Sequence, residues 1–247
     1  MLKKSKGVVI LKLGLIGFGG MGRVVAERAK LQGHEIPVVI RSSHATGDVD
    51  ELAKRLEGLD AVIDFSIGEA VATNARACLM ANVALVEGTT GWNDLRAKVL
   101  SEITEAGGAC VHAANFSIGV NLFYRMVSRA GELCANFDLY APFVEEAHHS
   151  RKRDAPSGTA LGLLDLLASS YAEEIPVAST RAGFIPGTHT VGFDSEFDQI
   201  TLTHTARARG GFADGALLAA SWIANRRGVY EFGEVLDEII REKAKGK

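Results

Sequence analysis

The sequence contains little cysteine, and its cysteines are not arranged for a structural role. Three occur in 247 residues, at Cys78, Cys110 and Cys134. They are far apart and odd in number, and none belongs to a CxxC or mixed Cys/His pattern, which argues against a disulfide framework and a zinc site. We therefore expect a reducing compartment and no bound metal.

Long apolar runs and a strong net charge are also absent. No run approaches the roughly 20 apolar residues of a membrane-spanning helix. Lys12 interrupts the apolar stretch near the start before a signal-peptide pattern is complete. The formal net charge of −3 argues against nucleic-acid binding through bulk electrostatics. We expect a soluble, cytoplasmic protein that binds neither membranes nor nucleic acid.

Up to about residue 118, short apolar runs alternate with helical patterns. Strands are predicted at Leu13–Ile16, Ile36–Ile40, Ala61–Phe65, Ala84–Val86 and Ala109–His112. Helices are predicted at Gly22–Gln32, Gly68–Ala81 and Trp92–Ala106. This alternation is typical of a parallel sheet with helices on both faces, so we predict an α/β fold with a doubly wound, Rossmann-type sheet.

The alternation ends after Asn121. Helices are predicted over 121–134, 159–171 and 212–225, and strands over 138–145, 189–193 and 199–206. In the last strand apolar residues alternate with threonines, which is typical of a sheet with one buried face. We expect an α+β domain with a mostly antiparallel sheet. The predicted dinucleotide-binding domain is 1–118, completed by 224–247, and the substrate-binding and oligomerisation domain is 119–223.

The first strand runs into a glycine-rich loop of the GxGxxG type. The loop comprises Gly17, Phe18, Gly19, Gly20, Met21 and Gly22. Its first glycine allows a tight turn, its second lets the backbone approach a pyrophosphate, and its third lets helix pack on strand. Amides at the helix N-terminus then face the phosphates. We predict a dinucleotide site, the alternative being a tight strand–helix connection without a ligand.

No carboxylate follows the second strand, where an acidic residue would bind the ribose of NADH. Arg41, Ser42 and Ser43 stand there instead. A guanidinium and hydroxyl groups suit a 2′-phosphate, which favours NADPH over NADH. The alternative is that Arg41 is only a solvated residue at a strand end.

Two further segments follow strands that end at the same edge of the sheet. Phe65 and Ser66 close the third strand, and Gly88, Thr89 and Thr90 follow the fourth. Carboxyl ends of parallel strands face the cofactor in this fold, and the exposed backbone and hydroxyls could bind a carboxamide. By pattern alone, an ordinary turn would be the better explanation of either segment.

The densest chemistry lies in Glu146–Ala160, which reads EAHHSRKRDAPSGTA. Three consecutive cations, Arg151 to Arg153, outweigh Asp154 and indicate a bound anion. Ser157, Gly158 and Thr159 begin a helix, whose amides and hydroxyls form a second anion site. Two neighbouring anion sites predict a small dicarboxylate substrate.

His148 and Lys152 are the candidates for proton transfer. Histidine titrates near neutrality, and a lysine among other cations gives up its proton more readily. The alternative is a solvated basic loop that contains one structural histidine.

These motifs resemble the dihydrodipicolinate reductase family of lysine and diaminopimelate biosynthesis. The most specific match is E-A-H-H-x-x-K-x-D-A-P-S-G-T at Glu146–Thr159. Support comes from the glycine loop, Asp64–Ser66, Gly88–Gly91, Asn115–Asn121, Gly187–Val191 and Phe212–Ala216. The resemblance implies reduction of the cyclic imine dicarboxylate made by dihydrodipicolinate synthase to tetrahydrodipicolinate, with NADPH or NADH.

The resemblance also implies residue roles and an assembly. His148 and Lys152 would assist proton transfer. Substrate carboxylates would be held by His149, Lys152, Gly158 and Thr159, and the nicotinamide would be lined by Gly88–Gly91, Ala114, Asn115 and Phe116. The family is typically a homotetramer that associates through the substrate-domain sheets.

Two alternatives remain open at this point. Another two-domain dehydrogenase, acting on an amino acid or a semialdehyde, would share the glycine loop without needing the histidine pair. A nucleotide-sensing relative that has lost catalysis would have lost its proton donor, yet His148 and Lys152 are both present.

Overall fold

The computed structural model describes residues 9–41 and 48–245, so Ser42, a predicted cofactor residue, lies outside the described residues. The chain divides into two compact units. The first comprises the chain up to Ser117 and from Phe212 onward, and the second comprises Ile118–Gly211. Among the described residues, no helix is both long and apolar enough to cross a membrane.

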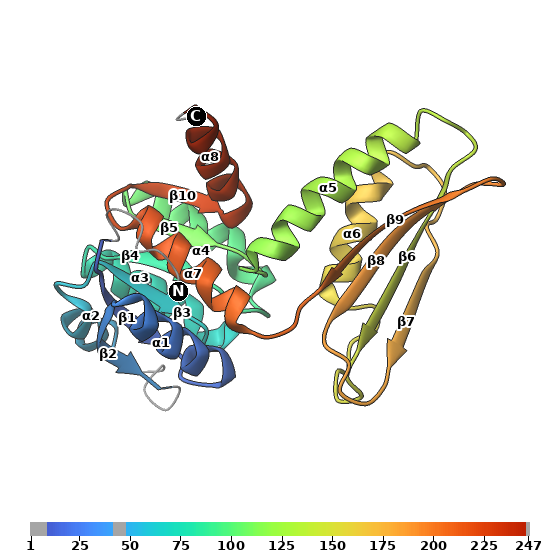
Figure 1. The fold of residues 1–247 in the computed structure, drawn as a ribbon. Helices are drawn as coiled ribbons and strands as arrows, with labels where there is room; N and C mark the ends of the chain where they lie inside the picture. The colour runs from blue at the N-terminus through green and yellow to red at the C-terminus, as the bar shows by residue number, and fades with distance from the viewer. Residues whose placement is uncertain (1–8, 42–47, 246–247) are drawn as a thin grey trace. The chain divides into compact units, whose positions relative to one another are not determined.

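The first unit is built on a six-stranded parallel sheet with the strand order β10-β5-β4-β3-β1-β2 (Figure 1). Its strands are β1 (Lys12–Ile16), β2 (Glu35–Ile40), β3 (Ala61–Asp64), β4 (Ala84–Glu87), β5 (Ala109–His112) and β10 (Gly228–Glu231). The predicted Rossmann-type sheet is confirmed. Its inner strands read as short apolar runs because a parallel sheet is covered on both faces. The four-residue strand β10 was not predicted from the sequence.

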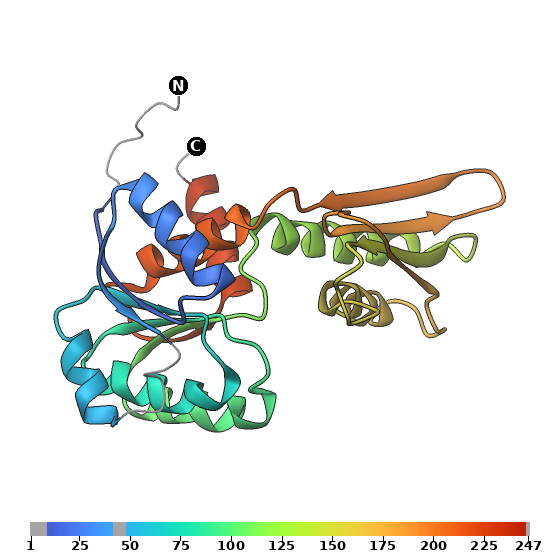
Figure 2. The same cartoon turned by 90° about the horizontal axis from the view of Figure 1, so that it is seen from below.

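Helices cover both faces of this sheet (Figure 2), with α1 and α7 on one side and α2, α3 and α4 on the other. The helices are α1 (Gly20–Gln32), α2 (Val49–Leu56), α3 (Val71–Met80), α4 (Asn93–Glu105), α7 (Gly210–Ile223) and α8 (Phe232–Lys245), and a short 3-10 turn, η2 (Gly68–Ala70), precedes α3. Helix α2 was missed, although Asp48 caps it by accepting a hydrogen bond from the Asp50 amide at 3.0 Å.

Helix α7 packs within the first compact unit from Phe212 onward, whereas the predicted domain boundary assigns residues 212–223 to the second domain. Its alanine-rich face is buried, and a side chain at Gly215 would overlap the Phe116 carbonyl. Asp214 accepts two hydrogen bonds from Arg28 of α1, each at 2.8 Å. Small residues thus let α7 pack closely within the nucleotide-type unit.

The second unit carries a four-stranded sheet with the order β7-β6-β8-β9. Its elements are β6 (Ala141–His148), β7 (Val177–Arg181), β8 (Thr188–Asp194) and β9 (Gln199–Thr205), with α5 (Ile118–Cys134) and α6 (Gly158–Ala168). Both helices pack on one face, around a core that includes Phe123, Leu163 and Phe193 (Figure 1). The predicted mostly antiparallel sheet is confirmed, except that the missed strand β7 pairs parallel with β6.

Strand β6 ends three residues later than predicted, at His148. Glu146 and His148 therefore lie on a strand and not in a loop. Residues two apart on a strand point to the same face, so the pairing of their side chains is set by the backbone.

Candidate active site

The glycine-rich loop connects β1 to α1. Gly17 has φ +82°, and a side chain there would overlap the Phe65 carbonyl. A side chain at Gly22 would overlap the Gly17 carbonyl, so Gly22 allows the helix to pack against the loop. An added Cβ at Gly19 would meet nothing within 4 Å. The loop thus leaves its backbone open where a phosphate would approach.

A cavity of about 320 Å³ lies beside this loop. It is lined by Gly17, Phe18, Gly19, Arg23, Arg41, Phe65, Ser66 and Ile67. The Arg41 guanidinium lies 5.6 Å from the centre of the Phe18 ring. Arg23 was not predicted, although its place in the first turn of the helix after the loop is visible in the sequence.

A second cavity, of about 270 Å³, brings together the remaining turns of this sheet edge. It is lined by Met21, Phe65, Ser66, Gly88, Thr89, Thr90, Ala114, Asn115, Phe116 and Phe212. All but Phe212 were predicted cofactor residues. Gly20 and Gly22 line neither cavity, because Gly20 is the exposed start of α1 and Gly22 is buried under the loop.

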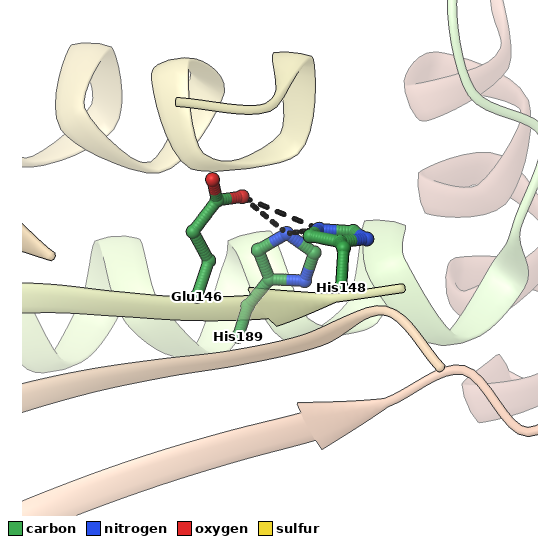
Figure 3. A group of neighbouring side chains, drawn as sticks. All are labelled: Glu146, His148 and His189. Atoms are coloured by element: carbon green, nitrogen blue, oxygen red, sulfur yellow. Dashed lines mark hydrogen bonds and ion pairs between the residues drawn. The ribbon is translucent and has the colours of Figure 1, made fainter. Parts of the chain in front are cut away.

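In the second unit, three buried polar side chains converge (Figure 3). Glu146 and His148 come from β6, and His189 lies directly opposite Glu146 on β8. Nε2 of His148 is 3.3 Å from both Glu146 Oε2 and His189 Nε2. His189 Nε2 is 3.5 Å from the same carboxylate oxygen. We call these three residues the Glu–His–His cluster.

The other carboxylate oxygen of Glu146, Oε1, is fixed by three donors. They are the Ser157 amide at 3.0 Å, the Ser179 hydroxyl at 2.8 Å and Arg181 Nη2 at 2.6 Å. Burial alone would raise the pKa of Glu146, but hydrogen bonds from Ser157, Arg181 and Ser179 outweigh it and lower the pKa to about 2. Glu146 is therefore a buried anion.

Both histidines of the cluster favour the neutral form. Burial lowers the pKa of His148 even though the Glu146 carboxylate acts in the opposite direction. Burial, together with the charge of His148, lowers the pKa of His189 to about 4. The cluster thus holds one negative charge beside two neutral imidazoles, which gain a proton in acid or when further negative charge arrives.

The predicted carboxylate site at the start of α6 adjoins this cluster. Ser157 caps α6 by accepting a hydrogen bond from the Ala160 amide at 3.2 Å, and its hydroxyl lies 3.0 Å from His189 Nε2. Because Ser157 is buried and used within the protein, Gly158 and Thr159 are the more accessible residues of this turn. The helix start remains a suitable anion site.

The basic segment divides into a bonded and a solvated part. Lys152 Nζ donates to both carboxylate oxygens of Asp154 at 2.8 Å, so a carboxylate holds the lysine in place. Arg151 and Arg153 are exposed. His149 is half-buried, and its Nδ1 has no hydrogen-bond partner within the described part of the chain.

Sequence reasoning assigned no role to Glu146, Arg181 or His189. Glu146 and His189 lie in motifs quoted above, but only the pairing of β6 with β7 and β8 shows that they meet each other and Arg181. A signal for His189 was its place in the Gly187–Val191 motif.

The cluster also has the composition of a metal site, with ligand atoms within 4.8 Å of one another. Two features favour hydrogen bonding instead. Arg181 already neutralises Glu146, so a dication would lie beside a guanidinium. Nδ1 of His189 is buried without a partner in the described chain, whereas metal-binding histidines usually donate that N–H to a second group. That the protein binds no metal therefore remains a prediction.

Comparisons with known proteins agree over most of the chain. Residues 11–116 match the family described as "Dihydrodipicolinate reductase, N-terminus", and residues 119–236 match "Dihydrodipicolinate reductase, C-terminus". A 4-hydroxy-tetrahydrodipicolinate reductase of Christiangramia forsetii is 32% identical over 94% of this chain and 100% of its own length. That of Thermosipho africanus is 34% identical over 92% and 99%.

A solved dihydrodipicolinate reductase of Paenisporosarcina sp. TG-14, with dipicolinate bound, shares the fold. It has a TM-score of 0.71 and 19% identity, over 90% of this chain and 98% of the other. The class follows first: the protein is an enzyme, an oxidoreductase that uses a nicotinamide nucleotide. Within that class, the chain belongs to the dihydrodipicolinate reductase family.

Proposed function

We propose that the protein reduces 4-hydroxy-tetrahydrodipicolinate, a cyclic imine dicarboxylate, to tetrahydrodipicolinate in lysine and diaminopimelate biosynthesis. The observation that carries this proposal is the Glu–His–His cluster beside Lys152 and the start of α6. These groups combine a proton donor with sites for two carboxylates. The names of the relatives over the whole chain length support the same substrate.

The protein's own residues bind the substrate and move a proton. The nicotinamide nucleotide supplies the hydride when bound, at the cavities beside the glycine loop and the Gly88–Thr90 turn. We assign the substrate carboxylates to His149 and Lys152 on one side, and to Gly158 and Thr159 at the helix start on the other. His148, assisted by Lys152, donates the proton that the reduced ring must gain.

The substrate itself prepares this proton donor. His148 is neutral in the free enzyme because burial lowers its pKa. A bound dianion adds negative charge next to the ring and raises that pKa, so the histidine takes up a proton as substrate binds. Glu146 stabilises the resulting imidazolium through Oε2. His189 contacts the hydroxyl of Ser157, the residue that caps α6, and so fixes this residue beside the cluster. We assign Glu146 and His189 as positioning residues.

NADPH is the proposed preferred cofactor, and NADH is the proposed alternative cofactor. Arg41 lines the cavity beside the glycine loop, and Arg23 adds a second cation to the same wall. Two guanidinium groups suit a 2′-phosphate, which NADH lacks.

The decisive experiment is a coupled assay with dihydrodipicolinate synthase product, measuring loss of NADPH and NADH absorbance. We expect oxidation of both cofactors only when that product is present. Cofactor binding without turnover would favour a sensing protein. Turnover with an amino acid or a semialdehyde instead would favour the other dehydrogenase class.

We further propose a homotetramer in the cytoplasm. Threonines form a polar ladder across β8 and β9, with the hydroxyls of Thr190 and Thr203 3.0 Å apart on an exposed surface. A second such surface could pack there. The three buried, free cysteines suit a reducing compartment. Light scattering of the purified protein tests the assembly, and a monomeric mass would overturn it.

A further inference from the structure

Two buried carboxyl groups lie side by side beneath the turns of the first unit. Asp64 is the last residue of β3 and Glu87 the last residue of β4, and the two pair directly in the parallel sheet. Their exposed fractions are 0% and 2%. Paired residues of neighbouring strands project to the same face, and the two carboxyl groups interact by hydrogen bonding and by charge.

No cation among the described residues offsets this pair. Asn74 of α3 donates to Asp64 Oδ2 at 2.7 Å. The remaining titratable neighbours are two thiols, Cys78 of α3 and Cys110 of β5, and the imidazole of His112, which pairs with Glu87 between β4 and β5. Burial raises the pKa of both thiols and lowers the pKa of His112, so all three groups favour the neutral form. The surroundings therefore give the pair dipoles but no positive charge.

One proton shared between Asp64 and Glu87 would remove the repulsion between two buried carboxylates. Two buried carboxylates without a cation cannot both be ionised, and burial raises the pKa of both groups, Glu87 strongly. Glu87 Oε2 is buried and accepts no hydrogen bond from the described residues. A proton held between Glu87 and Asp64 satisfies that oxygen.

The same pair fixes the two turns above it. Asp64 Oδ1 accepts the Ser66 amide at 2.8 Å, and Glu87 Oε1 accepts the Thr89 amide at 2.7 Å. The Ser66 amide also lies 3.1 Å from the Thr89 hydroxyl, which joins the turns to each other. Both turns line the 270 Å³ cavity that we assign to the nicotinamide.

We propose that Asp64 and Glu87 share one proton and act as positioning residues for the two cofactor-binding turns, so that loss of this proton weakens nicotinamide-nucleotide binding. Repulsion between two buried anions would separate β3 from β4 at their ends, where the turns start. The proposal rests on cofactor binding by the first unit and does not depend on the imine substrate.

The test is the dissociation constant of NADH as a function of pH, followed by nicotinamide fluorescence without substrate. NADH lacks the 2′-phosphate, whose own titration would obscure the result. Burial and the neighbouring carboxyl group raise the pKa of Glu87 well above its ordinary range, so the wild-type affinity should fall by about fivefold or more as the pH is raised from about 6 to about 9. Glu87→Gln keeps the acceptor for Thr89 and carries a permanent N–H towards Asp64. It should keep the affinity of the protonated wild type at every pH.

Glu87→Ala removes the acceptor and should bind NADH about fivefold more weakly at all pH values, the effect of about one lost hydrogen bond. The matched control is Glu102→Gln, which removes an exposed carboxylate of α4 paired with Arg76 and should retain the wild-type pH dependence. Thermal unfolding without NADH checks that each variant folds. A wild-type affinity that does not change with pH, or a pH dependence that persists in Glu87→Gln, overturns the proposal.

Discussion

Glu87 and Glu146 are equally buried, yet the protein gives them opposite charge states. Their exposed fractions are 2% and 3%. Glu87 faces another carboxyl group, and its pKa is raised well above the ordinary range by burial and by Asp64. Glu146 faces Arg181, two further hydrogen-bond donors and two imidazoles, and its pKa falls to about 2. Exclusion from solvent alone therefore does not decide which carboxyl is ionised, and the partners of each group do much to set its charge.

The two regions therefore respond to pH in opposite directions. A raised pKa means that the folded state holds the proton more tightly, so the contribution of Glu87 is present below pH 4.5 and is lost as pH rises. The lowered pKa of Glu146 works the other way, since its contribution is present above pH 4.5 and is lost towards about pH 2. One chain thus loses stability at its nucleotide site in alkali and at its histidine cluster in acid.

We call the surroundings of Glu146, where Arg181 offsets its charge, the compensated region. The largest expected effect comes from removing a cation of this region, Lys152. Lys152→Ala should lower kcat by about two orders of magnitude, consistent with loss of general-acid assistance. The matched control is Asp154→Asn, which leaves Lys152 without its carboxylate partner. Steady-state kinetics should show a much smaller loss for the control. Equal losses would show that Lys152 and Asp154 act as one unit, and unchanged turnover in Lys152→Ala would remove Lys152 from the mechanism.

Removing the Glu146 carboxylate, and with it the ion pair to Arg181, should lower both the free energy of unfolding and kcat. Glu146→Leu leaves Arg181 and the Ser157 amide without their acceptor, and loss of one partner of a buried ion pair costs about 3 kcal/mol. We expect denaturant unfolding to show this loss and kcat to fall about tenfold. Glu146→Gln keeps the shape and the acceptor oxygen, so it should recover most of the stability but not kcat, because the charge beside His148 is gone. Full recovery of kcat would contradict the assigned role.

The sequence predicted the compensated region only in part, for a physical reason. His148, Lys152 and Ser157 lie within one short segment, so their chemistry is visible together. His189 and Arg181 are more than 30 residues away from Glu146 and reach it through strand pairing. Residue type and spacing do not reveal strand register, because any register that keeps the apolar face buried satisfies the pattern.

The region around Asp64 and Glu87, where no cation offsets the carboxyl groups, was even harder to predict from the sequence. The sequence placed the Asp64–Ser66 and Gly88–Gly91 segments at one edge of the sheet, because both follow buried apolar strands. Glu87, which directly follows the predicted strand Ala84–Val86, was assigned no role, since only the adjacency of β3 and β4 makes it a partner of Asp64. The fold itself was easier to predict, because buried apolar runs identify the inner strands directly.

Acid unfolding should sharpen the contrast through His189. Its pKa falls to about 4, so the neutral ring stabilises the fold above about pH 6.5, and this contribution of about 3 kcal/mol is lost as pH falls towards 4. His189→Asn, which cannot titrate, should flatten unfolding free energy against pH across this window. Its alkaline dependence should stay as in the wild type, because Glu87 is unchanged. An unaltered acid limb would assign the acid sensitivity to other groups.

The smallest expected effect tests a cation that the protein does not use internally. Arg181 is bound to Glu146, whereas Arg41 is exposed over the Phe18 ring and lines the cofactor cavity. Arg41→Ala should raise KM for NADPH about fivefold and leave KM for NADH unchanged, since only NADPH carries the 2′-phosphate. Arg41→Lys keeps the charge but loses the planar guanidinium, so its KM for NADPH should lie between those of the wild type and Arg41→Ala. Equal changes in KM for both cofactors would show that Arg41 does not recognise the phosphate. Arg41 would then act through the glycine loop, and cofactor preference would have to come from Arg23.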